Sequence, residues 1–337
     1  MARLLEVSGL STHFSTEEGV VRAVDRVSFH VDEGETLGLV GESGCGKSVA
    51  ALSLLRLPPP PGRIVAGRIA YKGTDLMTLP ERQMRRYRGR EIALVFQEPM
   101  TALNPVFTVG YQIAEGLVVH KMMKKKEALE EAARLMALVR IPDARARVRD
   151  YPHQMSGGMR QRVMIAMGLA CRPSLLVADE PTTALDVTIQ AEILDLLVRL
   201  KEEFHLSLIL ISHNLGVIAE MADRVAVMYA GRIVEEAAVR DLFASPKHPY
   251  TAGLLRSVPR LGEGGAGPGR GRRRLEAIEG NVPNLLRLPP GCAFHPRCPD
   301  VMAECREAEP RLLALGGGVP GRAVACYKHH DREGRAR

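Results

Sequence analysis

Short apolar runs alternate with stretches of helical periodicity over the first 255 residues of the chain. The apolar runs, which we expect to form strands, are residues 37–40, 92–96, 175–178, 206–211 and 225–229. Between the second and third runs lies a long interval, residues 100–172, in which a helical pattern dominates. Strands that alternate with helices are typical of an α/β domain with a largely parallel sheet.

The composition changes after residue 255. Residues 261–274 read LGEGGAGPGRGRRR and contain too few apolar side chains to fold, so we expect a flexible basic linker there. A separate module over residues 275–330 follows, and it contains four of the six cysteines. The sequence therefore predicts a domain over residues 1–255, then a linker and a small cysteine-rich module over residues 256–337.

Charge is distributed unevenly between these two parts. The 337 residues include 46 Lys and Arg against 39 Asp and Glu, a formal net charge of +7. Residues 256–337 carry 15 basic and 9 acidic side chains, a net of +6, whereas residues 1–255 carry 31 and 30. Because the large N-terminal part is balanced, its charge gives no indication of a nucleic-acid surface.

The apolar runs also bear on location. All of them are far shorter than the roughly 20 residues that a membrane-spanning helix requires. The N-terminus, MARLLEVSGLSTHF, lacks the basic region, long apolar core and cleavage site of a secretory signal. We therefore expect a cytoplasmic chain that does not itself cross a membrane.

A glycine-rich segment directly after the run 37–40 matches the pattern GxxxxGK[ST] and precedes a helical stretch. Its residues are Gly41, Glu42, Ser43, Gly44, Cys45, Gly46, Lys47 and Ser48. Glycines let backbone N–H groups approach phosphate oxygens, and a helix N-terminus adds partial positive charge. We expect Lys47 to neutralise the β- and γ-phosphates of a nucleotide and Ser48 to supply a hydroxyl to Mg²⁺.

Two adjacent acids, Asp179 and Glu180, follow the apolar run 175–178. In a parallel sheet, ligands bind at the carboxyl ends of the strands, which is where these acids would lie. We expect Asp179 to hold Mg²⁺, directly or through water, and Glu180 to polarise the attacking water. Together with the phosphate loop, the two acids predict nucleotide hydrolysis.

Four smaller elements occur in order with these motifs. The segment MSGGM at residues 155–159 resembles the LSGGQ signature of ATP-binding cassette (ABC) proteins, with Met at both outer positions. Gln97 resembles the Q-loop glutamine of that family, ALD at residues 184–186 resembles its D-loop, and His213 resembles its switch histidine. The resemblance implies the ABC ATPase fold, an α/β nucleotide-binding domain with a parallel-sheet core, an antiparallel β subdomain and a helical subdomain that carries the signature.

The resemblance also implies how such a site works. Ser156, Gly157 and Gly158 would contact the γ-phosphate of ATP bound to a second cassette, so that two cassettes complete each site. Gln97 would ligate Mg²⁺ and report to a partner, while His213 would hold the γ-phosphate and orient the water. Hydrolysis removes the bridging phosphate and opens the dimer.

Two further residues take expected roles from the same resemblance. Asp186, in the D-loop, would belong to the nucleotide-binding set. Phe14, upstream of the phosphate loop, would stack on adenine as an aromatic residue of this family does. The alternative for Phe14 is a position in the hydrophobic core.

Four cysteines lie within 35 residues of the C-terminal module, while Cys45 and Cys171 stand apart. The four are Cys292, Cys298, Cys305 and Cys326. In a cytosolic protein, such a group favours a metal site over disulfides. Soft sulfur ligands suit Zn²⁺ or an iron–sulfur cluster, and the spacing does not separate the two. Free thiols are the third alternative.

Two segments resemble the C-terminal extension of ATPase subunits from bacterial dipeptide and oligopeptide importers. They are PKHPYTAGLL at residues 246–255 and GNVPNLLRLPPGCAFHPRCPD at residues 280–300. The latter segment is more similar to the first, D-type, ATPase of the importer's pair than to its companion. Some members of that subfamily carry a [4Fe–4S] cluster. The resemblance places such a cluster on the four module cysteines, with Zn²⁺ as the alternative.

The resemblance implies an ATP-hydrolysing subunit of an ABC importer for di- or oligopeptides, or for a related solute such as nickel. Its partners would be two transmembrane permease subunits, a second related ABC ATPase and an external solute-binding protein, at the cytoplasmic face of the inner membrane. Residues 99–108, next to Gln97, would form the groove for a coupling helix of the permease. The alternative is a soluble metal-containing ABC ATPase that acts on nucleic acid or ribosomes.

Overall fold

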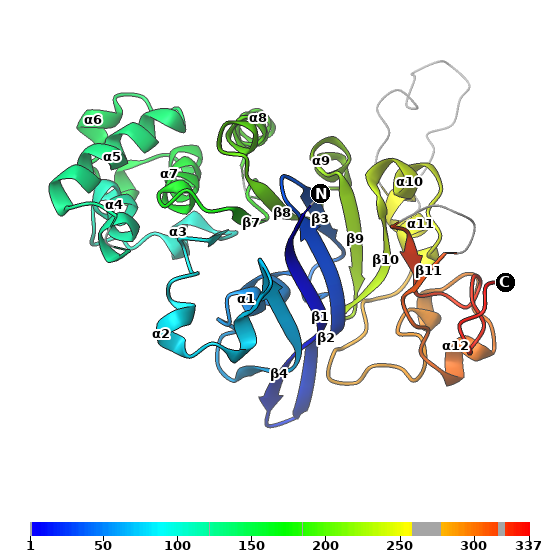
Figure 1. The fold of residues 1–337 in the computed structure, drawn as a ribbon. Coiled ribbons are helices and arrows are strands. Elements are labelled where there is room, and N and C mark those ends of the chain that lie inside the picture. The colour runs from blue at the N-terminus through cyan, green and yellow to red at the C-terminus, as the bar shows by residue number, and fades with distance from the viewer. Residues whose placement is uncertain (1, 121, 184, 258–277, 316–320) are drawn as a thin grey trace, which may run out of the picture.

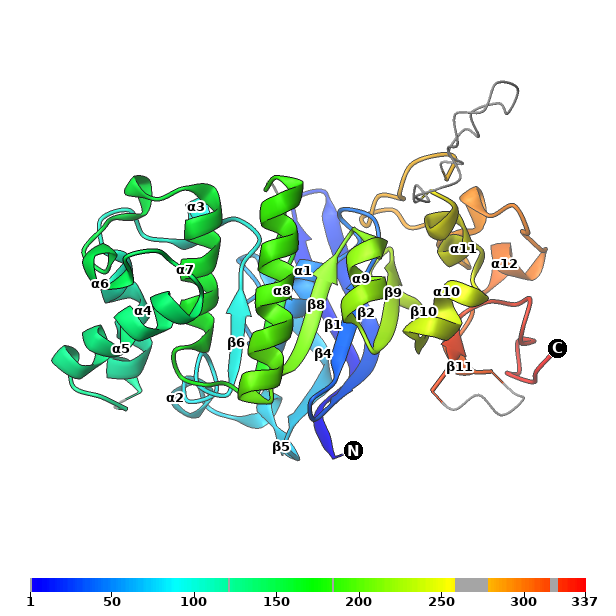
Figure 2. The same ribbon diagram turned by 90° about the horizontal axis from the view of Figure 1, so that it is seen from above.

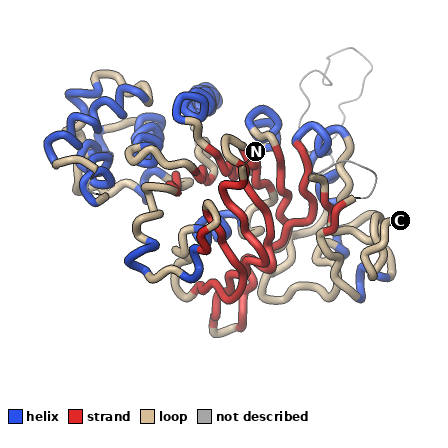
Figure 3. Tube along the Cα trace, viewed as in Figure 1, coloured by secondary structure: helices blue, strands red, loops and turns tan. Residues whose placement is uncertain are grey.

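The computed structural model describes residues 2–120, 122–183, 185–257, 278–315 and 321–337. Figure 3 shows strands through the middle of the molecule and helices outside them. The predicted linker at residues 261–274 lies outside the described residues.

A mixed sheet forms the centre of the described part of the chain, with eight strands in the order β11-β12-β10-β9-β3-β8-β7-β6. Its parallel strands are β3 (Thr36–Val40), β6 (Ile92–Val95), β7 (Leu175–Asp179), β8 (Ser207–Ser212) and β9 (Arg224–Tyr229). Their side chains are almost all buried, as continuous aliphatic runs require when both faces of a sheet are covered. The five strands expected from the sequence are confirmed.

A second sheet is antiparallel and follows the order β2-β1-β4-β5. Its strands are β1 (Arg3–Thr16), β2 (Gly19–Asp32), β4 (Gly62–Tyr71) and β5 (Thr74–Asp75). Leu5 and Val24 of this sheet belong to the same hydrophobic cluster as Leu54 of α1 (Lys47–Leu54) and Ile211 of β8. Helix α1 is therefore held between the two sheets, and the phosphate loop that precedes it is fixed in place.

A group of helices lies at one end of the large sheet, beyond β6 (Figures 1 and 2). Its members are α3 (Pro99–Ala102), α4 (Val109–Val119), α5 (Lys125–Leu138), α6 (Ala144–Arg147) and α7 (Gly157–Leu169). The helical interval expected at residues 100–172 is confirmed. A short helix, α2 (Glu81–Met84), precedes β6.

Other helices follow the later strands of the sheet. They are α8 (Val187–Phe204), α9 (Leu215–Met221), α10 (Val239–Ala244), α11 (Pro249–Arg256) and α12 (Glu304–Glu307). Helix α8 buries Ile193, Leu197 and Leu200 at helical spacing, and its N-cap Asp186 accepts a hydrogen bond from the Ile189 N–H. The hydrophobic face of α8 therefore points toward the sheet.

The C-terminal residues add two strands to the large sheet and pack against its hydrophobic core. Strand β12 (Ala323–Val324) pairs antiparallel with β10 (Arg232–Ala238), and β11 (Leu313–Ala314) pairs with β12. Phe294 is 2% exposed and belongs to the hydrophobic cluster that fills one face of the large sheet. The residues after 277 thus share both a sheet and a core with the first 255 residues.

A buried carboxylate joins three segments at this junction. Glu235 of β10 is fully buried and accepts hydrogen bonds from the backbone N–H groups of Lys247 and His248, both at 2.8 Å. Arg322, which precedes β12, donates to the same carboxylate at 3.2 Å. The negative charge of Glu235 is therefore stabilised by backbone N–H groups next to the start of α11 and by the Arg322 guanidinium of the C-terminal segment.

Removal of this carboxylate should destabilise the protein. We expect Glu235→Ala to lower the free energy of unfolding by about 3–5 kcal/mol, because the buried Arg322 guanidinium is left without a carboxylate to balance its charge. Urea denaturation measures the change. Glu307→Ala, which breaks an exposed pair with Arg332, is the matched control and should cost about 1 kcal/mol or less. Equal effects of the two substitutions would contradict the role given to Glu235.

Candidate functional site

The phosphate loop connects β3 to α1. Gly46 caps α1 with a φ of 102°, and a Cβ at this position would lie 2.0 Å from the Ala23 carbonyl oxygen. Only glycine fits there, because both the left-handed backbone and the close approach exclude a side chain. The loop is consequently held tightly against β2.

Lys47 is held inside this loop. Its ammonium group donates to the carbonyl oxygens of Gly41 at 2.8 Å and Glu42 at 3.0 Å, and the residue is 5% exposed. The Lys47 charge therefore lies at the loop, and its contact with the β- and γ-phosphates stays a prediction.

Asp179 lies at the carboxyl end of β7, beside the phosphate loop. Burial is the main cause that raises the pKa of Asp179, and the negative charge of Glu180 adds to it, while a hydrogen bond from Ser48 and the charge of Lys47 oppose it. Asp179 Oδ1 is buried and has no hydrogen-bond partner among the described residues. An orphaned carboxylate oxygen beside a serine hydroxyl is a donor set that fits Mg²⁺.

The Glu180 carboxylate contacts three side chains, which come from the loops after three different strands. Its Oε2 accepts hydrogen bonds from Gln97 Nε2 at 2.9 Å and from the Thr183 hydroxyl at 2.9 Å, and it lies 3.1 Å from His213 Nδ1. Glu180 itself has a φ of 46°, a backbone conformation that is strained for a non-glycine residue. The structure thus brings together Gln97, Glu180 and His213, which were predicted from distant positions in the chain.

The signature segment lies at the start of α7, in the helical group. Ser156 is the N-cap of α7 and accepts a hydrogen bond from the Met159 N–H at 3.3 Å. Cβ atoms added to Gly157 and Gly158 would lie 3.6 Å from Leu185 and 2.9 Å from Ile189. The signature therefore packs beside the D-loop of its own chain, while α7 and α1 belong to different layers (Figure 1).

Two further residues that were predicted at the nucleotide site, Asp186 and Phe14, make contacts with neighbouring elements of the fold. Asp186 caps α8 within the D-loop, and Ala184 of that loop lies outside the described residues. Phe14 is partly buried in β1 and lies opposite Gly62 of β4, where a Cβ would come within 2.6 Å of its ring. Its role in adenine stacking stays a prediction.

Two residues beyond position 245 contact the phosphate loop. These contacts were not predicted from the sequence. The Glu42 N–H donates to the Tyr250 hydroxyl at 2.9 Å, and Arg297 forms a two-bond ion pair with the Glu42 carboxylate. The available signal was that Tyr250 and Arg297 each belong to one of the two segments with a subfamily resemblance.

The four module cysteines are free thiols that lie close to one another. The Cys292 N–H donates to the Cys305 carbonyl at 2.8 Å. Burial raises the pKa of Cys292 to about 12 and that of Cys298 to about 11, and neighbouring thiols add to both shifts. Among the described residues, no group of three or more His, Cys, Asp or Glu side chains is arranged to hold a metal ion. The structure therefore does not support the predicted iron–sulfur or zinc site.

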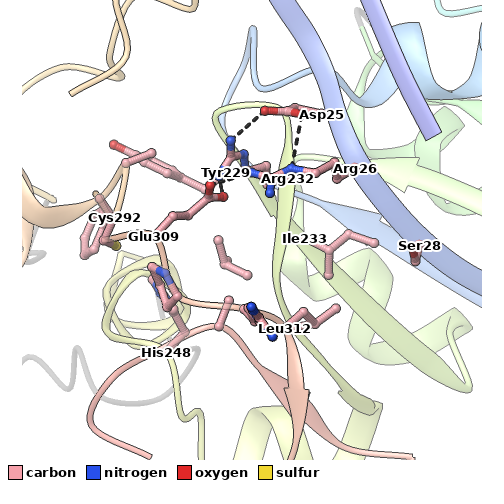
Figure 4. A pocket seen from close by; sticks show the side chains of 16 residues that line it. Asp25, Arg26, Ser28, Tyr229, Arg232, Ile233, His248, Cys292, Glu309 and Leu312 are labelled. Atoms are coloured by element: carbon pink, nitrogen blue, oxygen red, sulfur yellow. Dashed lines mark hydrogen bonds and ion pairs between the residues drawn. The ribbon is translucent and has the colours of Figure 1, made fainter. Parts of the chain in front are cut away.

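A cavity of about 360 Å³ separates part of the C-terminal segment from β2 and β10 (Figure 4). Asp25 and Arg232 form an ion pair at its wall, and Glu309, Cys292 and His248 also line it. Complete burial lowers the pKa of His248 to about 3, so this imidazole is neutral. The cavity does not include the phosphate loop or Glu180, and we assign it no part in hydrolysis.

Comparisons with known proteins agree with this geometry. Residues 24–183 match the family model of ABC transporters, and residues 234–305 match that of the oligopeptide/dipeptide transporter C-terminal region. Within the described ranges, none of the helices has both the length and the apolar composition needed to cross a membrane.

Curated relatives match the chain from end to end. A protein of Sinorhizobium fredii named as a probable peptide ABC transporter ATP-binding protein is 54% identical over 97% of this chain and 96% of its own length. The dipeptide transport ATP-binding protein DppD of Haemophilus influenzae is 49% identical, over 98% and 97%. The oligopeptide transport ATP-binding protein OppD of Salmonella typhimurium is 51% identical, over 96% and 93%.

Solved structures give the same fold. The dimeric ATP-binding cassette MJ0796, in a post-hydrolysis state with ADP and Pi, superposes with a TM-score of 0.63 at 25% identity over 70% of this chain and 99% of that one. The ABC ATPase fold expected from the sequence is confirmed over this part. By its full-length relatives, its two family matches and the geometry around Glu180, the chain belongs to the family of ATP-binding proteins of peptide ABC transporters.

Proposed function

We propose that this chain is the ATP-hydrolysing subunit of an importer of di- or oligopeptides, at the cytoplasmic face of the inner membrane. It works with two transmembrane permease subunits, a second related ABC ATPase and an external solute-binding protein. The observation that carries the proposal is the convergence of Gln97 and His213 on Glu180, in a chain that matches peptide-transporter ATPases over nearly its whole length.

Hydrolysis follows from the position of each side chain. Lys47 exchanges the carbonyls of its own loop for the β- and γ-phosphates of ATP. Ser48 and Asp179, with Gln97, would hold Mg²⁺, which when bound neutralises phosphate charge during the transfer. Glu180 would polarise the attacking water, and His213, 3.1 Å from Glu180 Oε2, would contact the γ-phosphate.

A second cassette completes the site. Ser156 caps α7 in a helical group separate from α1, so the start of this helix would offer backbone N–H groups to a phosphate on another subunit. The similarity to a cassette solved as a dimer supports this arrangement. The alternative role on nucleic acid or ribosomes has no support from the relatives or from the balanced charge of residues 1–255.

The permease would dock beside the Q-loop. Phe96, Met100, Val106 and Phe107 are 44%, 66%, 70% and 44% exposed, a concentration of apolar surface next to Gln97. Exposed apolar surface of this kind fits the apolar face of a short helix. Movement of the residues that form this surface would thereby be linked to the Gln97 side chain, which contacts Glu180.

The four module cysteines would hold a metal, as a [4Fe–4S] cluster or Zn²⁺, and act as a structural staple. The proposal rests on four soft sulfur donors in one segment, which lie near enough for neighbouring thiols to affect the pKa of Cys292, Cys298 and Cys326. Metal binding would require loss of the thiol protons.

The role of Glu180 is testable in the assembled importer. We expect Glu180→Gln to keep the Kd for ATP within about threefold and to lower ATP turnover at least 100-fold, because the amide cannot polarise water. Turnover and nucleotide retention are measured together. Glu203→Gln, at the exposed end of α8, is the control and should leave both unchanged. Undiminished turnover in Glu180→Gln would remove the residue from this role.

Adenine stacking by Phe14 has its own test. If the ring stacks on the base, Phe14→Ala should weaken ATP binding roughly fivefold or more, since such stacking contributes about 1–3 kcal/mol per base. Titration with ATP measures the effect, and Phe14→Tyr should preserve binding. An unchanged Kd in Phe14→Ala would assign the ring to packing against Gly62.

The metal proposal is tested on protein purified without oxygen. Metal analysis with an ultraviolet–visible spectrum should find either iron with cluster absorption or one zinc, lost in Cys305→Ser and retained in Cys171→Ser. Because the thiols of Cys292 and Cys298 must lose protons, metal affinity should rise as pH increases from 6 to 8. Protein without stoichiometric metal would contradict the proposal.

A further inference from the structure

Glu42, the second residue of the phosphate loop, is fixed at all of its polar groups. Its N–H donates to Tyr250, its carbonyl accepts from Lys47, and its carboxylate is bound by Arg297 through Nη1 at 2.8 Å and Nη2 at 3.0 Å. Two of these three partners come from the end of the cassette or beyond it. The phosphate loop is therefore fixed partly by residues of α11 and of the C-terminal segment.

Arg297 is itself firmly placed. Its side chain is 5% exposed and lies 5.8 Å from the Tyr229 ring and 6.0 Å from the Phe294 ring. Its Nε donates to the Glu279 carbonyl at 3.0 Å, and Nη2 reaches the Ile278 carbonyl at 3.4 Å. The hydrogen bonds to Glu42 are the main cause that raises the pKa of Arg297, so the guanidinium stays charged.

The charge balance at this position affects nucleotide binding. ATP brings several negative charges to the phosphate loop, and a free carboxylate on Glu42 would repel them at short range. The Arg297 guanidinium neutralises that carboxylate through two parallel hydrogen bonds, a geometry that lysine cannot reproduce. The carboxylate is thus paired with Arg297, while Lys47 contacts Glu42 only at its backbone carbonyl.

We propose that Arg297 is a positioning residue for ATP binding, which neutralises Glu42 and fixes the phosphate loop from the C-terminal segment. The proposal rests on the proposed function, because it assumes that the loop binds ATP. It makes ATP affinity depend on the placement of residues 278–298, in which Arg297 directly precedes Cys298. By reciprocity, bound ATP would stabilise that placement.

The test compares ATP affinity in the full-length chain, measured by isothermal titration or with a fluorescent ATP analogue. Arg297→Ala should raise the Kd for ATP about tenfold, and Arg297→Lys should give a smaller increase. Glu42→Gln in the Arg297→Ala background should recover most of the loss, because no unpaired carboxylate remains. A purely structural role for Arg297 would not be relieved by this second substitution.

The control is Arg332→Ala, which breaks an exposed ion pair with Glu307 in the same segment and should leave the Kd unchanged. In the assembled importer, Arg297→Lys should raise the KM for ATP more than it lowers kcat. Should Arg297→Ala fail to fold, Arg297→Lys with and without Glu42→Gln supplies the same comparison.

The results for wild-type protein and for the Arg297 variants test the proposed function and the role of Arg297 separately. Wild-type protein that binds no ATP would overturn the proposed function itself. Wild-type binding with unchanged affinity in both Arg297 variants, or a loss that Glu42→Gln does not relieve, would overturn only the positioning role of Arg297.

Discussion

Parallel pairing of four adjacent strands is the constraint on which the site depends. Val95 of β6 pairs with Ala178 of β7, Asp179 of β7 with Ile211 of β8, and Val40 of β3 with Ser212 of β8. In this register all four strands end at one edge of the sheet. The loops that follow these strands must then meet there, although the first begins at residue 41 and the last at residue 213.

Three side chains converge on Glu180 at that edge of the sheet. One carboxylate oxygen faces an amide, a hydroxyl and an imidazole. All three contacts are to the same oxygen, Oε2, so they set the direction in which the other carboxylate oxygen can face a water molecule. His213, at 58% exposure, has the most room to move. Access of water to the carboxylate is thereby tied to the positions of Gln97 and His213.

How much could be predicted from sequence differs between the two parts of the chain. The positions of Lys47, Asp179 and Glu180 at the ends of buried strands were predictable, because each belongs to a short motif next to an apolar run. The contact of Arg297 with Glu42 was not, because it joins residues 255 positions apart and depends on tertiary packing. The pairing of β12 with β10 was missed for a related reason, since a two-residue strand has no detectable periodicity.

The C-terminal strands also determine what the large sheet presents at its border. Without them, β10 would be an edge strand of seven residues with unpaired backbone groups, the kind of surface that pairs with other chains. Strands β12 and β11 cover part of that edge and leave at the border an element of only two residues. The C-terminal part of the chain, which also reaches the phosphate loop, thereby shortens the exposed edge of β10.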